Sequence, residues 1–233
     1  MEVTTASIDP ASRKALARMA EDLRRVFGDR FVALVTSEHQ TTAAFVTSIG
    51  SSDLDAIGSL VETWTREHLS TPLLMTVDEF RRSLDTFPAE YQSLLDHHVV
   101  IDGVPPFDGV RINPDDLRRA CEVQARGHLI HLRQGWIDAH GSERRLEALL
   151  VRSAAPLRLV LSNLAQLQGE DHADDAALAA FAGRAAGMSA DLVRGVLALD
   201  AAAPAPRSLV PRLPDYLNDA ERLWAFVDGW RTR

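Results

Sequence analysis

The sequence contains very little cysteine. Cys121 is the only one, so the chain cannot form an internal disulfide bond. It lies among apolar positions of an expected helix, and no general base is fixed beside it by the sequence. We therefore interpret Cys121 as a small core side chain rather than as a nucleophile.

Long apolar runs are also missing. No stretch approaches the roughly 20 apolar residues that a membrane-spanning helix needs, and the N-terminal residues contain no apolar signal region. These two absences predict a cytoplasmic protein that is not inserted in a membrane.

Positive charge is the scarcer sign. The 233 residues carry 25 Lys and Arg against 33 Asp and Glu, a net charge of -8 at pH 7. This balance argues against nonspecific binding to nucleic acid or to an anionic membrane. With 46% hydrophobic and 25% charged residues, the chain is expected to fold as one large or two modest soluble domains.

Familiar catalytic and metal-binding motifs are absent. The sequence shows no Ser-His-Asp order and no glycine-rich dinucleotide motif. Its separated histidines do not follow metal-ligand spacing, and the adjacent His97 and His98 would point to opposite faces of a strand. No metal centre and no bound cofactor are therefore expected.

The first half of the chain mixes helical and strand patterns. The expected helices cover residues 10–27, 52–69 and 76–84, and the expected strands cover residues 31–36, 43–49, 73–75 and 99–101. Asp9 and Gly28 mark the ends of the first helix, Ser52 is the expected cap of the second, and Thr76 begins a capping box. Residues 89–94 fit either a fourth strand or a helical turn.

The second half has helical patterns alone. Helices are predicted at residues 113–140, 142–167, 173–186, 190–199 and 215–230. Asn113 is the expected cap of the first of them, and Ser189 is the expected cap of the helix at 190–199. Pro156 should bend the second of them. The proline-containing loop VPPFDGVRI separates the halves, which predicts an α+β protein: a small mixed sheet in residues 1–108, followed by an α-helical bundle in residues 109–233.

Two segments carry a family resemblance. LLMTVDEFRRSLDTFPAEY contains a strand and an FP-x-E-[FY] segment, and HHVVIDGVPPFDGVRINPDDLRRACEVQARGHLIHLRQGW contains an HxV strand followed by an LRxxCExxxRGxLxxLRQ-aromatic helix. In these segments the chain resembles the bacterial nucleotidyltransferase-like proteins of the polymerase-beta superfamily with a helical C-terminal domain. A weaker similarity extends to the last helix.

The resemblance implies a catalytic pattern from which this sequence departs. Family members use a glycine-serine turn after the first strand, then two acids at i and i+2 on the next strand that hold magnesium ions. Here the turn has no glycine, and the acid positions fall near Thr42 and Ala44. Glu90 matches the third acid, which alone cannot build a two-metal site. The expected protein is a catalytically inactive member of the superfamily.

Two enzymatic alternatives stay open. One is an active nucleotidyltransferase whose metal site is rearranged around Glu38, Asp53 and Glu90, and only this alternative needs Mg²⁺ and a nucleoside triphosphate. The other is a HEPN-type ribonuclease, because the pairs Arg126–His131 and Arg133–His140 fit the loose R-x4-6-H pattern.

Glu90 is one candidate ligand-binding residue, and the helix after Asn113 contains the others. Arg119, Arg126 and Arg133 follow helical spacing and could clamp a nucleotide or small anion in a cleft between the domains. The interpretation that we favour is ion pairing, of Glu122 with Arg126 and of Arg133 with an acid on the other domain.

One further candidate ligand lies on the same helix. His128 fits a partly buried helix histidine better than a ligand. The third alternative for the whole protein is a purely structural or oligomeric module, and the protein could form a homodimer. Neither a membrane nor nucleic acid is an expected partner.

Overall fold

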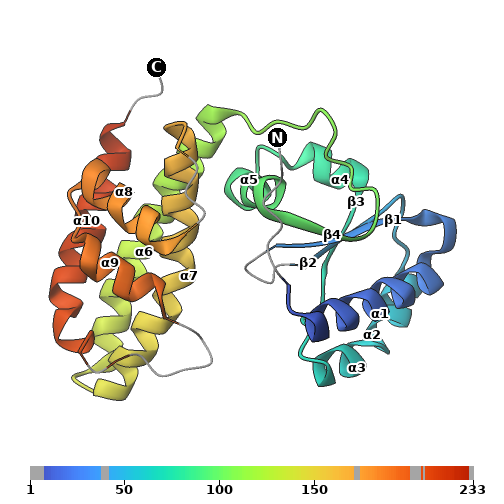
Figure 1. The fold of residues 1–233 in the computed structure, drawn as a ribbon, viewed down its shortest axis with the longest axis horizontal. Helices are drawn as coiled ribbons and strands as arrows, with labels where there is room; N and C mark the ends of the chain where they lie inside the picture. Colours follow the sequence, from blue (N-terminus) through green and yellow to red (C-terminus); the bar gives the residue numbers. More distant parts are fainter. Residues whose placement is uncertain (1–7, 38–41, 171–173, 200–205, 207, 231–233) are drawn as a thin grey trace. The chain divides into compact units, whose positions relative to one another are not determined.

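The computed structural model describes residues 8–37, 42–170, 174–199, 206 and 208–230 (Figure 1). The chain divides into two compact units, which are described separately below. The first comprises residues 1–87 and 91–112, and the second comprises residues 88–90 and 113–233. The protein is an α+β protein, with a mixed sheet and its helices in the first unit and helices in the second.

The sheet of the first unit has four described strands in the order β3-β2-β1-β4. They are β1 (Phe31–Ser37), β2 (Thr42–Val46), β3 (Leu73–Thr76) and β4 (His98–Gly103). β1 runs antiparallel to both β2 and β4, whereas β2 and β3 are parallel. The predicted hairpin and the two later strands are confirmed, and β2 ends three residues earlier than expected, at Val46.

Helices cover both faces of this sheet (Figure 1). They are α1 (Pro10–Phe27), α2 (Ser51–Gly58), α3 (Val61–Arg66), α4 (Val77–Arg82) and α5 (Pro88–His97), with a short 3₁₀ turn at Gly28–Arg30. Leu23 of α1, Ile57 of α2 and Trp64 of α3 belong to one apolar cluster with Leu34 and Val46 of the sheet. This cluster is the core of the first unit.

Local signals set most helix ends as predicted. The Asp9 carboxylate accepts hydrogen bonds from the backbone N–H groups of Ala11 and Ser12, and α1 ends at Gly28, whose positive φ of 56° is tolerated best by glycine. The capping box of Thr76 and Glu79 is present at the start of α4.

Two helix details of the first unit differ from the prediction, and one alternative that the sequence left open is decided. The helix expected over residues 52–69 is broken into α2 and α3 around Ser59 and Leu60. Gly50, not Ser52, is the N-cap of α2. The Asp53 carboxylate accepts the Gly50 N–H at 2.8 Å and so fixes the start of the helix. Of the two alternatives for residues 89–94, the helical one is correct, since α5 begins at Pro88, where a proline loses no helical hydrogen bond.

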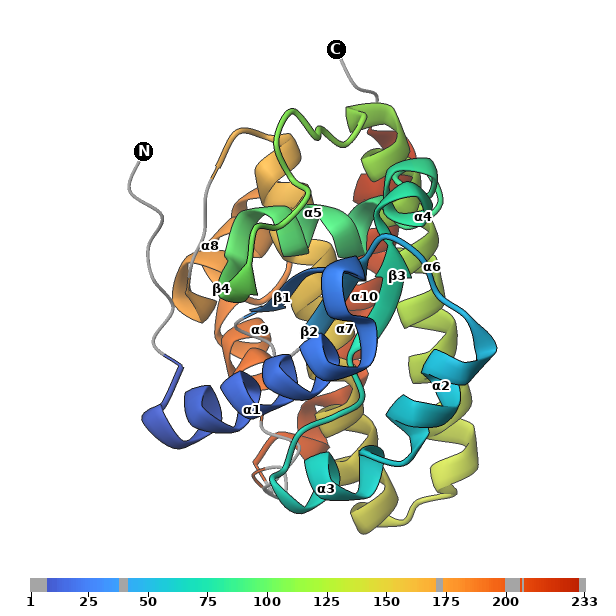
Figure 2. The ribbon, with the colours of Figure 1, turned by 90° about the vertical axis from the view of Figure 1, so that its right-hand side faces the viewer.

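The second unit is helical. Its elements are α6 (Pro114–Ala139), α7 (Glu143–Leu167), α8 (Asp175–Ala186), α9 (Ala190–Leu197), a 3₁₀ turn at Val210–Arg212 and α10 (Leu213–Gly229). α6 packs against α7 and α10, and α8 packs against α9 (Figure 2). α7 runs continuously through Pro156, and the first residue of the helix predicted at 173–186 lies outside the described part of the chain.

Contrary to the expectation from the sequence, one described helix is long and apolar enough to cross a membrane by length and composition. This is α7. More than half of its most apolar window is buried against the rest of the protein, and Leu150, Leu157 and Leu161 on it have no exposed surface. The core helix of a soluble protein meets the same criterion, so α7 is weak evidence for or against a membrane.

Candidate functional site

The two strand positions where the family resemblance places metal-binding acids lie on β2. Ala44 is fully buried and belongs to the apolar cluster that includes Leu23 of α1. The hydroxyl of Thr42 lies 3.3 Å from that of Thr36 on the paired strand β1. A methyl group and a hydroxyl already engaged with another hydroxyl offer no carboxylate for a magnesium ion.

The opposite face of β2 is packed by aromatic rings. The ring of Phe45 makes edge-to-face contacts with Phe80 of α4 at 5.3 Å and with Phe107 at 5.4 Å between centroids. Tyr91 of α5 continues the cluster at 5.0 Å from Phe80. The face of the strand that carries Phe45 is therefore apolar and offers no ligand to a phosphate or an ion.

Asp53, one of the acids that a rearranged metal site would need, binds an arginine. Its two oxygens accept hydrogen bonds from the Arg30 guanidinium at 2.7 and 2.8 Å, and one of them also accepts the Gly50 N–H. The Arg30 hydrogen bonds, followed by that from Gly50, lower the pKa of Asp53 from 3.8 to about 2. The geometry is that of a helix-capping ion pair, with both oxygens occupied by donors.

The other acids of that alternative do not add to a metal site in the described residues. Glu38 lies outside the described part of the chain. Glu90 is an exposed residue of α5, and its carboxylate accepts a hydrogen bond from the Gln124 amide of α6 at 3.2 Å. Among the residues that the structure describes, no group of three or more His, Cys, Asp or Glu side chains could hold a metal ion.

Each of the three predicted arginines on α6 has a partner in the second unit. Arg119 pairs with Asp116 one turn earlier, and Arg133 pairs with Glu221 of α10 at 2.5 Å. The Arg126 guanidinium lies over the Trp224 ring of α10, 5.6 Å from its centroid. These contacts hold the arginines within the helical region.

One of the ion pairs predicted for this row was wrong in its partner. Glu122 pairs with Arg118, four residues earlier, and not with Arg126. Arg133 pairs with Glu221 of its own unit. The sequence shows which residues share a helix face, but the acid that completes a pair across two helices depends on how those helices pack.

His128 is a buried residue of the helical core. Its ring Nε2 lies 2.8 Å from the hydroxyl of Tyr216 on α10, and both residues are almost fully shielded from solvent. Burial, helped by the charge of His131, lowers the pKa of His128 from 6.5 to about 4. A neutral imidazole that shares a hydrogen bond with a buried phenol fits the interpretation as a core histidine.

The two Arg–His pairs of the ribonuclease alternative do not form a joint site in the described residues. Arg126 and His131 are five positions apart on α6, so helical geometry turns their side chains about 140° from each other. Arg133 contacts Glu221, and His140 is the left-handed cap that ends the helix, with a φ of 46°.

Cys121 has the character expected of a core residue. Its side chain is fully shielded from solvent, and burial raises its pKa to about 12. A thiol in this state is not a nucleophile at neutral pH.

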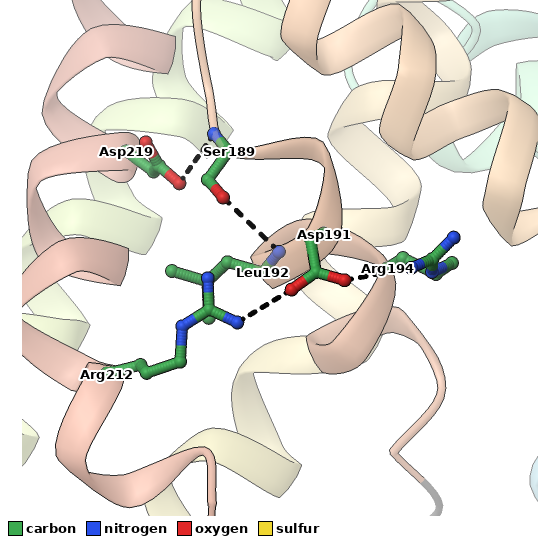
Figure 3. A network of polar contacts seen from close by, with 6 residues as sticks. All are labelled: Ser189, Asp191, Leu192, Arg194, Arg212 and Asp219. Atoms are coloured by element: carbon green, nitrogen blue, oxygen red, sulfur yellow. Dashed lines mark hydrogen bonds and ion pairs between the residues drawn. The ribbon is translucent and has the colours of Figure 1, made fainter.

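The polar network of the second unit that sequence reasoning missed surrounds the start of α9 (Figure 3). The buried carboxylate of Asp219 on α10 accepts the Ser189 N–H at 3.0 Å, and the Ser189 hydroxyl accepts the Leu192 N–H at 3.4 Å. Asp191 bridges Arg194 and Arg212 at 2.8 and 2.9 Å. Ser189 was a recognisable N-cap, whereas the spacing of α10 gave no signal that Asp219 would reach it.

Comparison with known protein families, with curated proteins and with solved structures found no match to this chain.

Proposed function

We propose that this chain is a nucleotidyltransferase-like protein of the polymerase-beta superfamily that has lost its metal site and acts by binding rather than by catalysis. Its first unit would be the degenerate nucleotidyltransferase domain, and its second unit the helical bundle that accompanies it. The family motifs in residues 73–91 and 97–136 are the basis of this assignment, and the α+β organisation is compatible with it.

The observation that carries the proposal is the environment of Ala44. A two-metal site needs carboxylates that converge on a solvent-accessible point beside the transferred phosphate. Ala44 is instead enclosed by apolar side chains of α1 and the sheet, and Thr42 is paired with Thr36. Introducing an acid at position 44 would bury an unpaired charge, which supports the proposed absence of a metal site there.

The contacts of the α6 arginines bear on what the protein binds. The guanidinium groups of Arg119 and Arg133 are paired with acids of their own unit, so they are less suited to hold a nucleotide phosphate than the sequence suggested. A protein partner is the ligand class that we favour, since an interface needs neither a metal nor a free row of cations.

A thermal-unfolding screen tests the proposal. The protein is melted with each nucleoside triphosphate, with and without magnesium, and in parallel with Asp53→Asn. We expect no magnesium-dependent rise of the midpoint in either form. A rise that depends on magnesium and disappears in Asp53→Asn would show that a rearranged metal site exists.

Glu67→Gln is the matched control for that variant. Glu67 is also an acid of the first unit that pairs with an arginine, Arg18, at 2.8 Å, but it belongs to no proposed metal site. Both variants remove one ion pair, so a loss of metal response confined to Asp53→Asn would identify ligation and not general destabilisation.

A further inference from the structure

Glycine directly follows aspartate at three places in the chain, after Asp102, Asp108 and Asp228. At such a pair the backbone nitrogen of the glycine can attack the side-chain carboxyl carbon of the aspartate and close a five-membered succinimide ring. Glycine favours this step because it has no Cβ atom to hinder the approach. The structure places the three pairs in a strand, a loop and a helix, so their freedom to react differs.

Asp108 lies in an exposed turn of the first unit, in the loop between β4 and α6. The Val110 N–H donates to the Phe107 carbonyl at 3.0 Å, and Gly109 has a φ of 69°, as the third residue of a type II turn does. Asp108 and Gly109 are both exposed, and a Cβ atom added to Gly109 would meet nothing within 4 Å. The backbone of the pair therefore has room for ring closure.

The two reacting groups of this pair are not held by other groups. Among the described residues, neither the Asp108 carboxylate nor the Gly109 N–H has a hydrogen-bond or ion-pair partner. Phe107, by contrast, is fixed by edge-to-face contacts with Phe45 at 5.4 Å and with His98 at 4.8 Å between ring centroids. The turn is thus anchored at its first residue, while the carboxylate and the amide that would react are free.

The pair at Asp102 is protected by its contacts. The Arg24 guanidinium donates to both carboxylate oxygens, at 2.5 and 2.8 Å. These bonds lower the pKa of Asp102 and keep the carboxylate ionised, and an ionised carboxylate is a poor electrophile. Gly103 is paired with Ala33 of β1, and a Cβ atom added to it would lie 2.1 Å from the Val32 carbonyl oxygen. Ring closure there would have to break the strand pairing.

The pair at Asp228 lies in the last turn of α10. Gly229 is the final residue of this helix, in which each N–H donates to the carbonyl four residues earlier. Trp230, which follows it, stacks on the ring of Phe226 at 6.0 Å between centroids, and its N–H donates to the Val227 carbonyl. Ring closure at this pair would require the turn to unwind.

We propose that Asp108 is the site at which the folded protein isomerises spontaneously to isoaspartate. The Gly109 nitrogen bonds to the side-chain carboxyl carbon of Asp108, and the hydroxyl of the protonated carboxyl leaves with the amide proton as water. Water then opens the succinimide. If it breaks the bond between the nitrogen and the original backbone carbonyl carbon, the chain runs through the side-chain carbon and the product is isoaspartate, whereas breaking the other bond restores aspartate. The loop before α6 thereby gains one backbone carbon. This inference does not depend on the family assignment.

Storage of the purified full chain in mildly acidic buffer tests the proposal. Samples taken over several weeks are digested with a protease that cleaves before aspartate but not before isoaspartate. The uncleaved fragment 102–114 reports isoaspartate at Asp108, and the fragments 96–107 and 219–233 report it at the other two pairs. We expect fragment 102–114 to accumulate at least about tenfold faster than either of the others, because the strand and the helix must open before they react.

The same chain kept unfolded in denaturant is the control, since all three pairs should then react at comparable rates. Gly109→Ala is the matched variant: it retains the cleavage site before Asp108 but adds a methyl group beside the attacking nitrogen, so fragment 102–114 should form severalfold more slowly. The proposal is overturned if the folded chain yields no fragment 102–114, or yields it no faster than fragment 96–107. An equal rate in Gly109→Ala, or the same preference for Asp108 in the unfolded chain, would also overturn it.

Discussion

Arg30 and Asp53 form a two-pronged ion pair at the start of α2, with both guanidinium–carboxylate distances below 3 Å. Asp53 also accepts the Gly50 N–H and thereby caps the helix. Asp53, which a rearranged metal site would need, thus has a structural role. This role is consistent with the catalytic inactivity that we propose.

The Arg30–Asp53 pair predicts a specific dependence of stability on acid. The pKa of Asp53 is lower in the folded state than its ordinary value, so its stabilising contribution is present above about pH 4 and is lost as the pH falls toward 2. The free energies of unfolding of the wild type and of Asp53→Asn should therefore differ most near neutral pH and converge only as the pH falls to about 2. A difference that stays constant over this range would contradict the assignment.

Tyr216→Phe should destabilise the second unit. The substitution leaves the buried Nε2 of His128 without its partner, and an unsatisfied buried polar group costs about 1–3 kcal/mol. Chemical denaturation measures the change. Tyr91→Phe is the matched control in the first unit: it removes a hydroxyl that contacts Ser83, which keeps a second partner in the Glu79 carbonyl. An equal effect of both substitutions would argue against a special role for the His128–Tyr216 bond.

His128 itself should make the protein less stable in mild acid. Its folded pKa of about 4 lies below the unfolded value of 6.5, so the unfolded chain binds the extra proton, and stability falls as the pH drops from about 6.5 toward 4. The loss should be on the order of 3 kcal/mol at pH 4. In His128→Gln this part of the pH dependence should vanish; if it persists, another group is responsible.

Asp219→Ala should loosen the start of α9. It removes the acceptor of the Ser189 N–H and a partner of Arg222, and a lost buried acceptor of this kind costs about 1–3 kcal/mol. Asp219→Asn should cost less, because its amide oxygen can still accept the Ser189 N–H. Asp191→Ala, which removes the exposed ion pairs of Asp191 on α9 with Arg194 and Arg212, should cost less stability than Asp219→Ala. Hydrogen exchange of the first α9 amides reads out the effect, and unchanged protection in Asp219→Ala would refute this role.

The sequence predicted the parts of the fold that depend on local signals. Asp9, Thr76, Asn113 and Ser189 cap helices as expected, and short runs rich in β-branched and apolar residues identified β1 and β2. These features depend on residues within one turn or one strand, so they can be predicted without the tertiary structure.

Long-range partners were not predictable in the same way. The helix expected from Ser52 to Leu69 is broken between α2 and α3, where Leu60 packs against the core cluster that contains Trp64 of α3. Glu221 and Tyr216 on α10 meet Arg133 and His128 of α6 from 88 positions away, and no spacing rule connects them. The candidate site shows the same difference: the sequence shows that Thr42 and Ala44 are not acids, but it could not show that Ala44 is buried under α1.

The most direct test of the proposed loss of catalysis is nucleotide transfer itself. The purified full chain is incubated with labelled nucleoside triphosphates, magnesium or manganese, and protein or RNA acceptors. We predict no metal-dependent incorporation of label above that of heat-denatured protein. Metal-dependent transfer that Asp53→Asn abolishes and Glu67→Gln retains would contradict the proposal.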